Sequence, residues 1–180
     1  MATMLYHFSD DAGIKVFEPR VPRVVPDRPK GQEWLNAPLV WAIAETFCPL
    51  YLFPRECPRI VMWRRPETTA DDVDRYFHNG SARMVAYVEL AWMDRIKQGR
   101  VTRYQLPHET FVDLNDAGMF VSRKAVRPLD QVALTDLAAE LAARQVELRA
   151  IPNLSVLNKA WDSSLQVSGI RLRNAANWSA

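Results

Sequence analysis

The sequence predicts an α+β fold, in which a mixed or antiparallel sheet has C-terminal helices packed outside it. Short apolar or alternating runs of strand length recur through the first two thirds of the chain, between turn-forming residues. In the last third, apolar residues recur instead at the three- and four-residue spacing of amphipathic helices. Strands followed by helices, without regular alternation of the two, are typical of the α+β class.

Five segments have the length and composition of strands, because each is a short run rich in β-branched or aromatic residues. They are residues 5–8, 40–43, 60–63, 84–89 and 101–106. Residues 119–129 are expected to be extended as well. Residues 44–55 are ambiguous, because Pro49 limits any helix there to short turns.

The clearest helix prediction covers residues 67–80. Thr69 is the expected N-cap, Asp72 stands at the third helical position, and Asn79-Gly80 is the expected end. Two later helices are predicted from their apolar spacing. Their inner faces carry Leu134, Leu137, Leu141 and Val146 in a long Ala-rich helix, and Leu154, Leu157, Trp161 and Leu165 in the next.

Proline is concentrated early in the chain, with nine of the twelve prolines between Pro19 and Pro66. Proline fixes φ and lacks an N–H, so residues 19–38 are predicted to form an ordered loop and not a helix or a central strand. Trp34 and Leu35 are expected to pin this loop to the core.

Length and composition indicate a single domain spanning residues 1–180. The chain is 48% hydrophobic and 24% charged, as is usual for globular proteins. Its formal net charge of +2 creates no strong overall field toward nucleic acid or an anionic membrane. No signal-like N-terminus and no run of 18 apolar residues is found, so we expect a cytoplasmic protein without a membrane partner.

Cys48 and Cys57 each precede a proline and have no further cysteine to form a cluster. Two such cysteines make a poor metal site, and in a reducing compartment they stay thiols. We therefore expect two buried structural cysteines, no disulfide and no bound metal.

The first candidate site is the segment Met-Leu-Tyr-His-Phe-Ser-Asp-Asp at residues 4–11. It delivers His7 and Ser9 to one side of a strand, directly before a polar turn, where scaffolds commonly present reactive groups. The imidazole of histidine has an unperturbed pKa close to neutrality, which suits acid–base work. The alternative is a half-buried His7 that simply hydrogen-bonds a loop.

As a whole, the chain resembles an uncharacterised family of small bacterial proteins that open with Leu-Tyr-His-Phe-Ser-Asp-Asp. More distantly, three segments resemble the ADP-ribosyltransferase-like fold, which includes RNA 2′-phosphotransferases. They are residues 5–9, the Val-Trp-Ala run at 40–42, and residues 120–129. The resemblance implies a split antiparallel sheet with a cleft for NAD or a related nucleotide or phosphorylated ribose.

The same resemblance implies roles for individual residues. His7 would hydrogen-bond the ribose next to the nicotinamide, and Ser9 would lie beside it. Trp41 and Ala42 would line the floor of the pocket, and Tyr51 would stack on the nicotinamide. Two departures bear on activity: Ile43 stands where the family pattern has Thr, and no Glu occurs between residues 111 and 130, where active transferases often carry one.

Arginines in the Pro-rich loop are candidates for phosphate binding, because guanidinium matches phosphate oxygens bidentately. We expect Arg20 or Arg23 to reach the rim of the cleft; the alternative is a solvated loop whose arginines pair with Glu18, Asp27 and Glu33. Alternation places Glu89 at the solvent face of its strand, although a displaced catalytic acid is the other interpretation.

Three functions remain open from the sequence. The leading one is a nucleotide-handling protein that binds NAD or a phosphorylated ribose near His7. The second is an interaction module on the same fold without chemistry, and the third is a small phosphotransferase or hydrolase that uses His7. The sequence does not identify a macromolecular acceptor.

Overall fold

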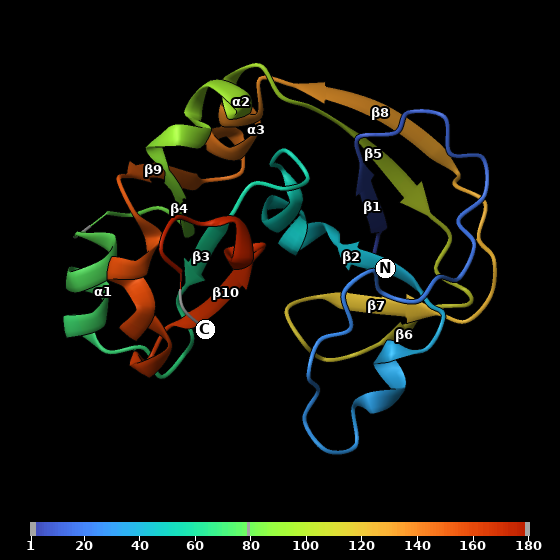
Figure 1. The fold of residues 1–180 in the computed structure, drawn as a ribbon, viewed down its shortest axis with the longest axis horizontal. Coiled ribbons are helices and arrows are strands. Elements are labelled where there is room, and N and C mark those ends of the chain that lie inside the picture. The colour runs from blue at the N-terminus through green and yellow to red at the C-terminus, as the bar shows by residue number, and fades with distance from the viewer. Residues whose placement is uncertain (1–2, 79, 179–180) are drawn as a thin grey trace. The chain divides into compact units, whose positions relative to one another are not determined.

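The computed structural model describes residues 3–78 and 80–178 and confirms the α+β class. It contains a six-stranded antiparallel sheet and a four-stranded mixed sheet (Figure 1). The chain divides into two compact units, residues 1–48 with 101–133 and residues 49–100 with 134–180. The single domain expected from length stays a prediction.

The first unit contains the six-stranded sheet in the order β6-β7-β2-β1-β5-β8. Its strands are β1 (Leu5–Ser9), β2 (Val40–Ala44), β5 (Arg100–Leu106), β6 (Val112–Asp113), β7 (Met119–Ser122) and β8 (Asp130–Thr135). β1 lies between β2 and β5 and pairs antiparallel with both. Three of the five strands expected from the sequence, at residues 5–8, 40–43 and 101–106, meet in this one sheet, together with β7 from the first part of the extended segment 119–129.

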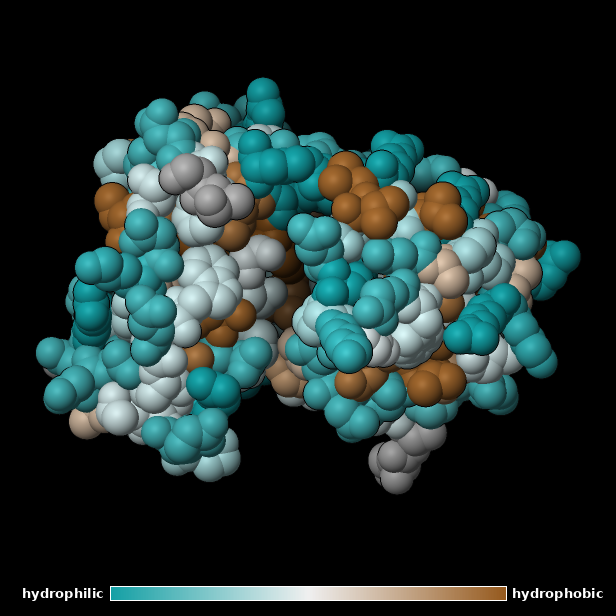
Figure 2. All heavy atoms as spheres, turned by 60° about the horizontal axis from the view of Figure 1, so that its bottom comes forward, coloured by the Kyte–Doolittle hydropathy of each residue, from teal (hydrophilic) through white to brown (hydrophobic). Residues whose placement is uncertain are grey.

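The Pro-rich loop lies on this unit and follows the expected pattern only in part. It contains one short 3-10 helix, η1 (Glu33–Asn36), and a two-residue bridge between Arg20 and Leu39. Leu35 is buried as predicted, whereas Trp34 is 39% exposed and lies outside the buried core. More generally, the surface of the first unit, at the right of Figure 2, carries patches of hydrophobic residues among hydrophilic ones.

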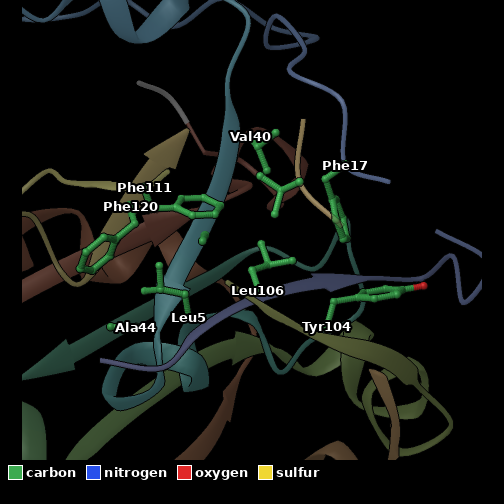
Figure 3. Close-up of a cluster of buried hydrophobic side chains, with 10 residues drawn as sticks. Leu5, Phe17, Val40, Ala44, Tyr104, Leu106, Phe111 and Phe120 are labelled. Atoms are coloured by element: carbon green, nitrogen blue, oxygen red, sulfur yellow. The ribbon is translucent and has the colours of Figure 1, made fainter. Parts of the chain in front are cut away.

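The two faces of the six-stranded sheet differ, and we name each after one of its residues. The main hydrophobic core of the unit packs on the His7 face and is drawn in Figure 3. Its buried residues are Leu5, Phe17, Val40, Ala42, Ala44, Tyr104, Leu106, Phe111, Phe120 and Val126. The Trp41 face carries a smaller cluster, in which Trp41 and Leu114 pack against Leu35, Leu39 and Val121.

The second unit contains the four-stranded sheet in the order β10-β3-β4-β9. Its strands are β3 (Arg59–Trp63), β4 (Met84–Glu89), β9 (Val146–Ile151) and β10 (Gln166–Ile170), with β4 and β9 parallel and the other pairs antiparallel. The helical segments are α1 (Ala70–Phe77), η3 (Leu90–Trp92), α2 (Met93–Lys97), α3 (Leu137–Ala143), η4 (Leu154–Asp162) and η5 (Leu172–Asn174). A seventh, η2 (Glu45–Tyr51), is the short turn expected around Pro49 and crosses from the first unit into the second.

Helix α1 begins as predicted. The Thr69 hydroxyl accepts a hydrogen bond from the backbone N–H of Asp72, which satisfies one of the donors left open at a helix start. The helix ends at Phe77, because His78 adopts the left-handed conformation with φ 48°. Asn79, half of the expected stop signal, lies outside the described residues.

The long helix predicted from Leu134 to Val146 is wrong, whereas Leu154, Leu157 and Trp161 of the next predicted helix do lie in one helical element, the 3-10 helix η4. Leu134, Leu137 and Val146 lie in three different elements, β8, α3 and β9, and residues 166–170 form strand β10. The left-handed residues Asp136 (φ 50°) and Gln145 (φ 59°) interrupt any continuous helix, since a helix cannot pass through such a conformation. β9 instead gains a parallel ladder with the buried strand β4, a partner that local spacing does not disclose.

Both cysteines are buried and unbridged, as expected. Burial raises the pKa of the Cys57 thiol to about 12, against the opposing effect of the nearby Arg59 charge. In the part of the chain that the structure describes, no helix is both long and apolar enough to span a bilayer.

Candidate functional site

The His7 side chain lies on the His7 face of the six-stranded sheet and is partly exposed. The register pairs His7 with Tyr104 of β5, and paired residues share one face of a sheet. His7 Nδ1 lies 2.8 Å from the carbonyl oxygen of Trp41 on β2. A carbonyl can only accept, so Nδ1 carries a proton and donates it. This bond fixes the orientation of the ring.

The Phe17 ring contacts the imidazole, with the two ring centroids 4.7 Å apart. The Tyr104 ring lies edge-on to Phe17 at 5.2 Å, and both of these rings are drawn in Figure 3. The Tyr104 hydroxyl donates to the carbonyl of Asp11 at 2.7 Å and accepts from the N–H of Ile14 at 3.2 Å. Tyr104 therefore fastens residues 11–14 over the end of β1.

Ser9 is on the same face as His7, as the alternation predicts, but its hydroxyl stabilises the turn that follows β1. It is 7% exposed, and its Oγ accepts the backbone N–H of Asp11 at 3.1 Å. The Asp11 carboxylate in turn accepts the N–H of Gly13 at 2.7 Å. These bonds close the Asp-Asp-Ala-Gly turn and fix the direction in which the chain leaves β1.

The structure does not bring the Trp41 ring to the His7 side chain. Trp41 pairs with Val121, whereas Ala42 pairs with Phe120 of the main core, so Trp41 points to the opposite face. There the Arg28 guanidinium lies 5.6 Å from the ring centroid. The backbone of Trp41 contacts His7, and its side chain belongs to another surface.

Tyr51 belongs to the second unit, where the Arg59 guanidinium lies 5.7 Å from its ring centroid. Arg20 and Arg23 are both exposed in the Pro-rich loop. The backbone of Arg20 exchanges two hydrogen bonds with Leu39, each 3.2 Å long, so Arg20 is anchored beside the start of β2. Within the first unit, the Trp41 ring and the His7 side chain lie on opposite faces of the sheet. The convergence of His7, Ser9, Trp41 and Tyr51 on one cleft stays a prediction.

A hollow of about 330 Å³ lies on the first unit close to the turn that follows β1. It is lined by Ile14 and Lys15 from that segment and by residues 127–131. Backbone hydrogen bonds between Phe17 and Val126, at 2.8 and 2.9 Å, hold these two segments together. The Phe17 ring also contacts His7, so Phe17 connects the imidazole to the backbone bridge beside the hollow. Lys15 and Arg127 provide two cations at the hollow, beside the carboxylate of Asp130.

Strand β7 carries no acid where the transferase pattern has one. Ser122 is 1% exposed, and its hydroxyl lies within hydrogen-bond distance of two acceptors, Thr110 Oγ1 at 2.9 Å and the carbonyl oxygen of Lys124 at 3.3 Å. Ile43, which replaces the expected Thr, is 2% exposed within the sheet. Both positions are structural. Among the described residues, no three His, Cys, Asp or Glu side chains gather as metal ligands would.

The sequence did not single out four residues that shape this site. Tyr104 and Phe17 hold His7, but only the strand order places them beside it. Lys15 and Arg127 share a hollow through the Phe17–Val126 bridge, a contact between segments more than 100 residues apart. The local sequence signal for this hollow was limited to the two cations, each of which is adjacent to a residue that packs inward: Lys15 follows Ile14, and Arg127 follows Val126.

Residues 6–175 match the sequence profile of a family described as a family of unknown function, DUF6886. The chain belongs to this family. The match runs from β1 to the residues after η5 and so includes both units. The comparisons with the curated proteins and with the solved structures find no match.

Proposed function

We propose that the first unit binds a small molecule with a phosphorylated ribose, NAD being the leading candidate, at the His7 face beside the hollow. The observation that carries this proposal is the fixed imidazole of His7. Its Nδ1–H is held by the Trp41 carbonyl and its ring by Phe17, so the imidazole has a set orientation. A ribose hydroxyl is a donor that suits such a group.

The hollow supports the phosphate end of the same ligand. Its volume of about 330 Å³ lies within the usual range of small-molecule sites. Lys15 and Arg127 are suited to bind phosphate oxygens, the arginine bidentately. An extended chain advances about 7 Å over two residues, so Lys15 lies within reach of a ligand that also contacts the His7–Phe17 pair.

The ADP-ribosyltransferase-like fold remains part of the proposal for the first unit. The three segments that carry the resemblance form adjacent strands, in the order β7-β2-β1, which agrees with a common site. The buried, hydrogen-bonded Ser122 on β7 favours binding over transfer, because no carboxylate is there to stabilise a developing positive charge. Ligand binding without transferase chemistry is accordingly the function that the geometry supports best.

The roles predicted for Trp41, Tyr51, Arg20 and Arg23 stay predictions. Trp41 faces away from His7, and the proposal above does not depend on any of the four. Substituting them therefore separates the two versions of the site: a ligand that stacks on Tyr51 would lose affinity in Tyr51→Ala, whereas a ligand held by His7, Lys15 and Arg127 would not.

Isothermal titration with NAD, ADP-ribose and AMP tests the proposal. We expect binding to the unmodified protein, and a loss of at least tenfold in affinity for His7→Ala and for the double variant Lys15→Gln/Arg127→Gln. The matched controls are His108→Ala, at an exposed histidine of the same unit, and Lys97→Gln, at an exposed lysine of the other. Absence of binding for all three compounds, or equal losses in the controls, would refute it.

A further inference from the structure

Three arginine–aromatic pairs lie on the Trp41 face of the first unit, away from His7. The Arg103 guanidinium lies 4.8 Å from the centroid of the Tyr6 ring, Arg28 lies 5.6 Å from Trp41, and Arg123 lies 5.5 Å from Trp34. The members of each pair are separated by 13 residues or more in sequence. The pairs are therefore a product of the fold and not of local sequence.

The register places these pairs on one surface. Tyr6 pairs with Ile43 and Trp41 with Val121, and both belong to the face opposite Leu5 and Ala42. Arg103 pairs with Phe8, which shares that face. Trp34 belongs to η1, whose Leu35 packs on the same cluster as Trp41. β2, β1 and β5 are consecutive strands, so the first two pairs are a few strand spacings apart.

The surface is exposed and predominantly cationic. Trp34 is 39% exposed, and the side chains of Arg28, Arg103 and Arg123 are partly or fully exposed. Arg28 is held in place, because its Nε donates to Asn36 Oδ1 at 3.2 Å. Arg28 lies in the Pro-rich loop, whose other exposed cations are Arg20, Arg23 and Lys30 and whose carboxylates are Asp27 and Glu33. Cations thus outnumber acids in this loop, although the whole chain has a net charge of only +2.

We propose that the Trp41 face binds single-stranded nucleic acid. A guanidinium over an aromatic ring offers a flat surface on which a base can stack, and its N–H groups can bind the phosphates on either side. A row of such pairs suits a flexible strand, whose bases are unstacked and accessible. A duplex hides its base faces and could use only the charges, and an acidic polypeptide has no rings to stack. This proposal goes beyond the small-molecule site, which lies on the other face.

Fluorescence anisotropy with a labelled 12-nucleotide oligouridylate tests this inference on the full chain. The test variant is Arg28→Gln/Arg123→Gln, and the control is Arg75→Gln/Arg95→Gln. In the control both exposed arginines also lie over aromatic rings, 5.3 Å from Tyr76 and 4.7 Å from Trp92, but in the second unit. We expect at least tenfold weaker binding for the first variant and less than twofold for the control. A second pair, Trp34→Ala against Trp161→Ala, isolates stacking at an exposed tryptophan in each unit.

Salt dependence supplies a second readout. Each phosphate contact to a single strand contributes about −0.7 to the slope of log affinity against log salt, so loss of two contacts should flatten the slope by about 1.4. Circular dichroism checks that both double variants are folded. Equal weakening in test and control variants would overturn the proposal. It would also be overturned by a duplex of equal length that binds as tightly, or by poly-glutamate that competes as well as unlabelled oligouridylate.

Discussion

The two units differ in the kind of polar group that they bury. In the second unit, Arg59 and Glu89 are each 3% exposed, and both use their charge on backbone groups. In the first unit, the buried polar side chains among the described residues are the hydroxyls of Ser9, Thr102 and Ser122. The charged side chains of the first unit stay partly or fully exposed.

The buried charges of the second unit fasten chain segments together. Arg59 donates from Nε and Nη2 to the Leu50 carbonyl, at 2.9 and 2.7 Å, and from Nη1 to the Cys57 carbonyl at 2.9 Å. Glu89, expected at the solvent face, instead accepts the N–H groups of Ala176 and Leu154. Burying a charge without partners costs free energy of folding, and these hydrogen bonds offset that cost for Arg59 and Glu89.

This contrast separates stability from binding. A charge that is bonded to backbone partners cannot also hold a ligand, so the two buried charges of the second unit, Arg59 and Glu89, are committed to the fold. The first unit keeps its cations at the surface and orients His7 by a hydrogen bond, as the proposed ligand site requires. Substituting a buried charge of the second unit should accordingly lower the free energy of unfolding. Substituting His7 or a surface cation of the first unit should instead lower the affinity for a ligand.

The largest stability effect is expected for Arg59→Met. Burial lowers the pKa of Arg59 to about 10, and its guanidinium satisfies two buried carbonyls. Methionine fills a similar volume but leaves both carbonyls without their donor, at a cost of about 3 kcal/mol. Urea unfolding should show this loss, while Lys97→Met, at an exposed position of α2, should change the free energy of unfolding by less than about 0.5 kcal/mol. Equal effects would contradict the structural role of Arg59.

A smaller loss, about 2 kcal/mol, is expected for Glu89→Gln. The amide nitrogen cannot accept a hydrogen bond, so one of the bonds from Ala176 is lost and a donor faces a donor. Hydrogen exchange should quicken at residues 172–178 first, because this segment depends on Glu89. Glu67→Gln is the control, since its ion pair with Arg65 is largely exposed and worth little. Unchanged exchange in residues 172–178 would show that the carboxylate does not hold them.

The smallest effect depends on pH and concerns Cys57. The pKa of its thiol is raised to about 12 in the folded protein, from an ordinary value of 9.0. The unfolded chain therefore loses this proton first, so the thiol destabilises the fold as pH rises above 9. At pH 10 the loss amounts to about 1.4 kcal/mol relative to pH 7. Cys57→Ala, which lacks the thiol, should lose that much less between the two pH values. Identical pH profiles would contradict the burial of this thiol.

The sequence predicted the parts of the fold that local patterns determine. The strand at residues 84–89 and the Thr69 cap needed only alternation, composition and capping chemistry. The C-terminal third could not be predicted in this way. Leu134, Leu137, Leu141 and Val146 have helical spacing, but Gln145 turns the chain and β9 pairs with β4, a partner more than 50 residues away.

The candidate site was predictable to the same degree. The sequence indicated His7 and Ser9, and alternation along β1 correctly put them on one face. It could not show that Trp41 faces the other way, because the relative faces of two strands depend on their register. Glu89 illustrates the same limit: as a charged residue at the end of an apolar run it was expected at the solvent face, yet every residue of β4 is buried.

The most direct test of the central claim is a titration of isotope-labelled protein with ADP-ribose, followed by amide NMR signals. We expect the largest shifts at Ser9, Asp11–Phe17 and Arg127, with the amides of Arg59 and Glu89 unaffected. His7→Ala should abolish the shifts while leaving the spectrum of a folded protein. Shifts confined to the second unit, or shifts that persist in His7→Ala, would contradict a phosphorylated-ribose site at the His7 face.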